Sequence, residues 1–172
     1  MKKLILSTLL LPVFALANST SYLTFSVGEL TLPFIDSGSV YLDDVDGYSL
    51  SFMNVIDDKT LVGLSRLEAT GRFDGSVTGV SASYAFDSFN AGSMYVGITY
   101  ANSDLVNDTS TGYSIGYAKV SGNGTDFNLS ATTVDGLVSY EVSVTADSGL
   151  LFGISESNAQ SIVSVGYRMP LN

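Results

Sequence analysis

Apolar and polar residues alternate with a period of two along most of the chain beyond residue 20. In the closing stretch, Val163 and Val165 occupy one set of alternate positions, whereas Ser164 and Gly166 occupy the other set. We call each set of alternate positions along a strand a parity. This alternation is typical of β-strands, in which successive side chains point to opposite faces. The stretch at 60–70 is the least regular, and a bulge is expected there. The predicted strands lie at about residues 20–27, 48–52, 60–70, 79–86, 94–101, 113–118, 127–132, 138–145, 150–155 and 161–169.

Turn-forming residues fill the gaps between these stretches. Examples are GNGT at 122–125, DG at 135–136 and DSG at 147–149. Gly, Asn and Asp adopt the backbone conformations that tight turns need, so consecutive strands are predicted to form hairpins in a meander. We count ten strands, with eight as the alternative. An even number returns both termini to one side of a barrel, as bacterial outer-membrane barrels require.

The polar parity indicates which face of the strands meets water. It consists mainly of Ser, Gly, Thr, Ala and Asn, and it contains very few charged residues. A soluble surface is expected to carry roughly a quarter to a third Lys, Arg, Glu and Asp. Small uncharged polar side chains suit a confined wet lumen instead. The sequence therefore predicts an all-β fold, an antiparallel up-and-down transmembrane β-barrel whose apolar parity faces lipid.

Tyrosines near the strand ends support this assignment of faces. A tyrosine ring has an apolar body and a polar tip, so it can rest at the level of lipid headgroups. The alternative is that these rings belong to a soluble core. The tyrosines on the apolar parity are Tyr48, Tyr84, Tyr100, Tyr113 and Tyr167.

The first residues have the pattern of a bacterial secretory signal peptide. Lys2 and Lys3 precede an apolar run, and Ala15-Leu16-Ala17 forms an A-x-A cleavage site. We therefore expect a signal peptide at 1–17 and a single outer-membrane β-barrel domain at 18–172. No later apolar run approaches the roughly 18 residues of a membrane-spanning helix, so strands would have to cross the membrane.

The amino-acid composition argues against several classes of function. The chain has 17 acidic and seven basic residues, with a net charge of −10, which argues against binding nucleic acid. It has no cysteine and no histidine, so disulfides, zinc sites and the ordinary nucleophile–base pairs are absent. We expect no enzymatic activity, no cofactor and no metal. Composition alone does not exclude a glycosidase that uses two carboxylates, although no such pair can be identified in the sequence.

The longest expected connection runs from Gly28 to Gly47. It contains Pro33, which argues against a central strand. Its segment YLDDVDGY at 41–48 has part of the spacing of a calcium loop, but the closing glutamate is missing, so a plain acidic turn is favoured. Long loops on outer-membrane barrels face outside and carry recognition, and a passive lid is the alternative.

Parity places two charged residues inside the barrel, Glu141 and Arg168. Burying either charge alone would be costly, so each is expected to meet water or an opposite charge. Interior polar packing and a selectivity site are the two roles left open. A closed barrel also requires the last strand to pair with the first, and we expect that pairing to end near Met169 because Pro170 cannot donate a ladder hydrogen bond.

Two strand and turn units, DGYSLSF at 46–52 and VSVGYR at 163–168, resemble those of the small OmpA-type or opacity-protein-like outer-membrane β-barrels. In that family the last strand is an assembly signal that commonly ends GYRF. Here Met169 follows Arg168, and Tyr167 would supply the aromatic ring. The resemblance implies a location in the bacterial cell outer membrane, with contacts to outer-membrane lipid and, during biogenesis, to the barrel-assembly machinery.

The function predicted from the sequence is a structural, surface-exposed or adhesion-like role without catalysis, with an extracellular ligand that the sequence does not identify. One alternative is a narrow porin-like channel for small solutes, which the small polar interior favours and the low strand number opposes. Another is a soluble secreted β-protein that binds an apolar ligand.

Overall fold

The computed structural model describes residues 20–36, 39–70, 75–104, 108–121, 124–157 and 161–171. The expected signal peptide at 1–17 lies outside them. No helix in the described residues is long and apolar enough to cross a membrane. The described chain forms ten strands: β1 (Thr20–Asp36), β2 (Ser39–Ile56), β3 (Thr60–Thr70), β4 (Gly75–Ala85), β5 (Ser93–Ser103), β6 (Asp108–Lys119), β7 (Asp126–Val134), β8 (Leu137–Thr145), β9 (Leu150–Ser157) and β10 (Ser161–Leu171).

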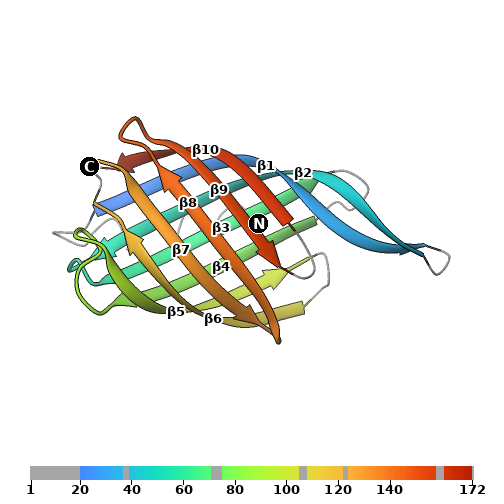
Figure 1. The fold of residues 1–172 in the computed structure, drawn as a ribbon, viewed down its shortest axis with the longest axis horizontal. Helices are drawn as coiled ribbons and strands as arrows, with labels where there is room; N and C mark the ends of the chain where they lie inside the picture. The colour runs from blue at the N-terminus through green and yellow to red at the C-terminus, as the bar shows by residue number, and fades with distance from the viewer. Residues whose placement is uncertain are drawn as a thin grey trace, which may run out of the picture.

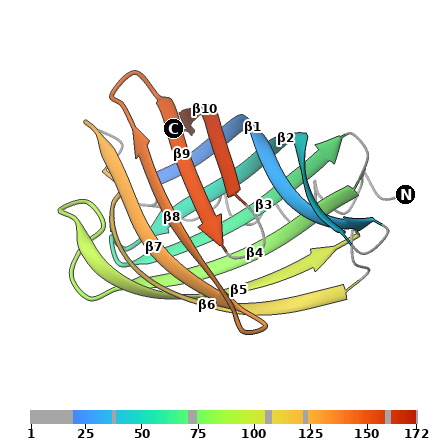
Figure 2. The ribbon, with the colours of Figure 1, turned by 45° about the vertical axis from the view of Figure 1, so that its right-hand side comes forward.

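The strands form a closed barrel in which each pairs antiparallel with its sequence neighbours, and β1 also pairs with β10 (Figure 1). The closing register runs from Thr31 opposite Ser161 to Ser21 opposite Leu171. Figure 2 shows this seam on one wall, where β9, β10 and β1 lie side by side. The ten-stranded up-and-down barrel is confirmed, and the eight-stranded alternative is wrong. Closure leaves no open edge along the wall of the barrel, so the backbone groups there have ladder partners.

The pairing of β10 extends further than the sequence predicts. Pro170 lies opposite Tyr22, and the ladder with β1 ends at Leu171 rather than at Met169. The backbone N–H of Arg168 donates to the carbonyl of Gly149, on the β9 side of the strand. Two residues later the nitrogen of Pro170 points to the same side, beyond the start of β9, so its missing N–H leaves no partner unpaired.

The expected bulge in β3 is absent. β3 pairs residue by residue with β2 from Thr60 to Thr70 and with β4 from Thr60 to Ala69. Its irregular sequence pattern comes from Arg66 and Glu68, which lie on the outward parity and form an exposed ion pair with each other. Charges on this parity interrupt the apolar alternation without disturbing the backbone.

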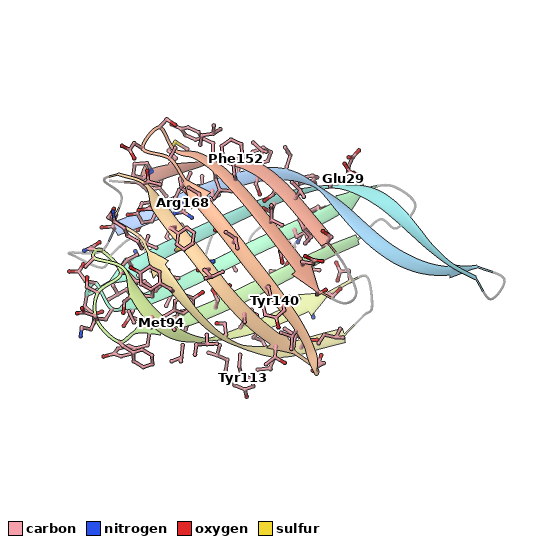
Figure 3. The ribbon with its side chains drawn as sticks, viewed as in Figure 1. Glu29, Met94, Tyr113, Tyr140, Phe152 and Arg168 are labelled. Carbon is pink, nitrogen blue, oxygen red and sulfur yellow. The ribbon has the colours of Figure 1, made fainter. Side chains whose placement is uncertain are left out.

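The outer wall of the barrel is apolar. Phe25, Ile98 and Val142 are 49%, 47% and 43% exposed, as are large apolar side chains on most other strands. In Figure 3, Tyr113 and Phe152 point away from the barrel axis. Phe52 shares this parity but is buried.

Tyrosines border the apolar wall at both ends. The tyrosines expected there from the sequence are all exposed, and so are Tyr117 and Tyr140. Tyr84, Tyr117 and Tyr167 lie near the end of the barrel at which β1 begins and β10 ends, which we call the terminal end of the barrel. Tyr48, Tyr100 and Tyr140 lie toward the opposite end, which we call the ribbon end.

The region expected to be a long loop, 28–47, is instead an extended hairpin. β1 and β2 continue to Asp36 and Ser39, and they form a two-stranded ribbon that projects beyond the barrel (Figure 1). β10 pairs only as far as Thr31, and β3 only as far as Asp46, so the outer ribbon has one partner per strand. Pro33 lies in this part, opposite Leu42, where a proline does not disrupt a second ladder.

The close approach of β1 and β10 generates a first prediction. A Cβ atom on Gly166 would overlap the carbonyl oxygen of Phe25 and would lie 2.6 Å from Cβ of Ser26. We expect Gly166→Val to prevent closure of the barrel, because backbone atoms at the seam would have to separate. The folded, heat-modifiable band on an SDS gel should be lost.

Ala82→Val is the matched control, because Ala82 is exposed on the outward parity of β4. This variant should fold like the wild-type protein. A Gly166→Val protein that folds with an unchanged denaturation midpoint would contradict the register of the seam.

Candidate binding lumen

The inward parity forms a polar belt around the middle of the barrel. Serine, threonine and glycine dominate it, and small side chains leave the barrel interior unfilled. Two neighbouring cavities of about 280 Å³ and 310 Å³ occupy this space. Side chains that line one or both cavities are Ser26, Ser49, Ser81, Ser83, Thr99, Ser114, Asn128, Ser130, Glu141, Ser143, Ser164 and Arg168.

An apolar cluster packs inside the terminal end of the lumen, and we call it the floor. Phe89 and Ala85 are 1% and 0% exposed, and Phe89 comes from the turn between β4 and β5. Its ring lies 5.9 Å from the ring of Tyr95, centroid to centroid. The floor consists of Tyr22, Val55, Ala85, Phe89, Tyr95, Ala118 and Val120, with Met53 and Leu61 packed against it.

Backbone hydrogen bonds fix the β4–β5 turn across the end of the barrel. The N–H of Phe89 donates to the carbonyl of Asp58 at 2.8 Å, and its carbonyl accepts from the N–H of Val120 at 2.8 Å. The side-chain amide of Asn90 donates to the carboxylate of Asp58 at 2.6 Å. The turn therefore bridges the β2–β3 turn and the end of β6, two segments that are not neighbours in the ladder.

A buried ion pair lies beside this floor. Nη1 of Arg168 is 3.3 Å from Oδ2 of Asp126, and the two side chains are 13% and 6% exposed. The carboxylate of Asp126 also accepts hydrogen bonds from the backbone N–H and the hydroxyl of Ser121, at 2.9 Å and 3.1 Å. The guanidinium carbon of Arg168 lies 5.8 Å from the centroid of the Tyr22 ring. The pair ties β10 to β7, which are separated by two strands.

Two donors in this cluster have no hydrogen-bond partner among the described residues. They are Nε of Arg168 and the hydroxyl of Tyr22, both buried. A buried donor without an acceptor is costly, and each of these groups lacks an acceptor to which it could donate a hydrogen bond.

Glu141 lies on the inner wall of β8, above the floor. Its Oε1 accepts hydrogen bonds from Nδ2 of Asn128 at 3.2 Å and from the hydroxyl of Ser143 at 3.4 Å. The hydroxyl of Tyr95 in turn donates to Oδ1 of Asn128 at 3.0 Å. Glu141 and Arg168 both line both cavities, so the two charges predicted from parity face one space.

The ring of Tyr95 depends on a glycine in the neighbouring strand. Tyr95 lies directly across from Gly116 in the register of β5 and β6. A Cβ atom at Gly116 would lie 2.8 Å from the Tyr95 ring and 2.5 Å from the carbonyl oxygen of Leu129. Only glycine therefore leaves room for this ring in the lumen.

Several of these residues are not identifiable as a site from the sequence. Tyr22 and Tyr95 could have been noticed, since they are large rings on the parity of small residues. Phe89 lies in a turn segment and Asp126 at a strand start, and nothing in their local pattern indicates an inward position. Their roles depend on which non-neighbouring strands the barrel brings together.

No group of three metal-ligating side chains occurs in the described residues. The acidic segment at 41–48, considered above as a calcium loop, lies in the β1–β2 ribbon. Its side chains at 41–45 lie outside the described residues.

The fold and lumen define a class: an up-and-down barrel with an apolar outer wall and a polar interior, which is the polarity of transmembrane barrels. Neither protein-family models nor curated protein sequences match the chain. Among solved structures, it is similar to the KdgM porin, with a TM-score of 0.46 and 9% identity over 90% of this chain and 99% of the porin in its complex with disordered oligogalacturonate.

Two further structures are similar. Neisserial surface protein A has a TM-score of 0.39 and 15% identity, over 89% of this chain and 99% of that protein. The outer membrane protein OprG from Pseudomonas aeruginosa has a TM-score of 0.38 and 13% identity, over 87% and 96%. The likenesses are distant, so we base the function on this chain's own residues.

The floor generates a second prediction. We expect Phe89→Ala to lower the free energy of unfolding by about 3 kcal/mol or more, because a buried ring would leave a cavity at the end of the barrel. Urea titration of the protein in detergent micelles measures this change. Phe86→Ala is the control: Phe86 is 61% exposed on the outer wall, so its loss should cost less. Equal costs for the two variants would show that Phe89 does not pack as described.

Proposed function

We propose that this protein is an outer-membrane β-barrel of the bacterial cell with a surface-exposed, adhesion-like or structural role and without catalysis. The observation that supports this most directly is the continuous apolar outer wall, which surrounds a polar lumen. Soluble monomers rarely expose contiguous apolar patches larger than a few hundred Å². Lipid is the environment in which such a wall and a closed ladder are both stable.

The ribbon supports the surface role. Outer-membrane barrels carry their recognition elements on the extracellular side, and the β1–β2 ribbon is the part of this barrel that projects furthest from it (Figure 1). We propose that the ribbon end faces outside, and that the terminal end faces the periplasm. The partner on the outside is unidentified, and contacts with the assembly machinery belong to the same proposal.

A narrow channel is the second candidate. The serine-lined cavities favour it, whereas the apolar floor with the β4–β5 turn across it opposes a continuous path for ions. A soluble protein with an apolar ligand is less well supported, since its ligand would meet a polar lumen while apolar side chains faced water.

Fractionation of cells that express the full chain tests the location. We expect the folded, heat-modifiable protein in the outer-membrane fraction, soluble only after detergent is added. Recovery of a folded monomer from the soluble periplasmic fraction would overturn the proposal. Planar-bilayer recordings separate the two membrane roles: the surface role predicts no steady conductance, and a stable open level would support the channel.

Two adjacent residues of β8 provide a third prediction. Val142 is 43% exposed on the outer wall, whereas Ser143 lines both lumen cavities. Val142→Arg should destabilise the barrel in phospholipid vesicles by roughly 2–4 kcal/mol, because it places a charge near the middle of the lipid. Ser143→Arg should be tolerated better in lipid, since its side chain reaches water and Glu141. Urea unfolding in vesicles measures both, and equal costs would contradict the assignment of faces.

A further inference from the structure

A groove of about 560 Å³ lies on the outer wall of the barrel, at the base of the β1–β2 ribbon. β1 runs between β10 and β2 here, and all three strands contribute exposed apolar side chains of outward parity. These side chains are Val27, Tyr48, Val163 and Val165. The groove is continuous with the apolar wall, so in a bilayer acyl chains would occupy it.

Two carboxylates border this groove on its ribbon side. Glu29 and Asp46 lie opposite each other in the β1–β2 ladder, two residues beyond the pair formed by Val27 and Tyr48. Both acids line the groove and are exposed, and Glu29 points away from the barrel in Figure 3. Opposed side chains on one face of an antiparallel pair have Cβ atoms about 4.5–5.5 Å apart, and like charges in these positions are destabilising.

Neither of these carboxylates has a basic partner among the described residues. The hydroxyl of Thr70 donates to the backbone carbonyl of Asp46, which leaves the carboxylate itself unused. Glu68, a further acid of outward parity nearby, forms its ion pair with Arg66. The other basic residues that the structure describes lie in the lumen or toward the terminal end, and they are Lys59, Lys119 and Arg168.

The charge of the groove distinguishes between possible occupants. A second copy of this chain, placed on the groove by twofold symmetry, would bring the same two acids against them, and like charges at short distance repel. A lipid with an anionic headgroup would meet the same repulsion. A lipid with an ammonium headgroup matches both parts of the groove, because its acyl chain packs on the apolar side chains and its N–H groups donate to the carboxylates.

We propose that this groove binds a membrane lipid whose headgroup carries a primary ammonium, with the acyl chain against the valines and the ammonium between Glu29 and Asp46. A primary ammonium has three N–H donors, so it can reach both carboxylates of an opposed pair. Any phosphate of the same lipid can stay in water, since both acids are exposed at an open groove and not enclosed in a cavity. This inference rests on the proposed function, because it requires the outer wall to lie in lipid.

Native mass spectrometry of the folded protein, released from detergent micelles, tests this proposal. The micelles contain equal amounts of phosphatidylethanolamine and phosphatidylcholine with the same acyl chains. The two lipids share a phosphate and a net charge, but the choline group has no N–H donor. We expect the protein to retain phosphatidylethanolamine over phosphatidylcholine at least about threefold, which is the scale of an exposed ion pair. Phosphatidylglycerol, which is anionic, should be retained least.

A double variant, Glu29→Gln with Asp46→Asn, should retain phosphatidylethanolamine and phosphatidylcholine equally, because it keeps the groove and removes both charges. It should fold at least as well as the wild-type protein, since it removes a like-charge pair. The matched control is Glu156→Gln, which changes an exposed acid of β9 that lies opposite Tyr140 and does not line the groove. This control should keep the wild-type preference. Heat-modifiable migration shows for each variant whether the barrel is folded.

Four results would overturn the proposal. They are equal retention of the two lipids by the folded wild-type protein, retention of neither lipid, an unchanged preference in the folded double variant, and stronger retention of phosphatidylglycerol when Mg²⁺ is added. The last result would indicate a metal ion between the carboxylates and a phosphate. A protein that fractionates with the outer membrane but shows no headgroup preference would contradict this inference and leave the proposed function standing.

Discussion

The rest of the structure depends on the ladder between β1 and β10. Eleven residue pairs, from Thr31 with Ser161 to Ser21 with Leu171, close the sheet. Without them two strand edges would be exposed, and in lipid each free N–H and C=O would cost several kcal/mol, of the order estimated for unsatisfied polar groups in apolar surroundings. Gly166 allows the two backbones to approach at this seam, where any side chain would meet Phe25.

Closure fixes which side of every strand is inside. Once the barrel is closed, the pleat sends alternate residues to the lumen and to the outer wall, so one register decides the environment of all ten strands. The sequence agrees with this at nearly every position, with Ser and Gly on one parity and large apolar residues on the other. The outward pair Arg66 and Glu68 is tolerated on this face because each neutralises the charge of the other, opposite Leu50 and Tyr48 of β2.

Features with a local cause could be predicted from the sequence. The strands, their number, the two faces and the inward positions of Glu141 and Arg168 follow from a period of two and from turn residues. The β1–β2 ribbon could not be predicted as strand, since Pro33 indicates a break. Only the three-dimensional pairing shows that each strand of this part has a single partner, so that the proline is tolerated there. The partners of Arg168 and Phe89 could not be predicted from the sequence either. Asp126 and Asp58 are distant from them in sequence, and closure of the barrel brings them together.

The two ends of the lumen are filled unequally, and this asymmetry creates the candidate site. Ten strands enclose more space than serine and glycine side chains can fill, so a barrel of this size needs large residues wherever it is to be solid. Tyr22, Phe89 and Tyr95 provide that bulk only at the terminal end, and Gly116 makes room for one of them. The middle belt stays hollow, and Glu141 and Arg168 lie at the boundary between the packed floor and the hollow belt. A charged group at this boundary is desolvated on the floor side and accessible on the other, which is the condition under which a small polar ligand gains most from binding it.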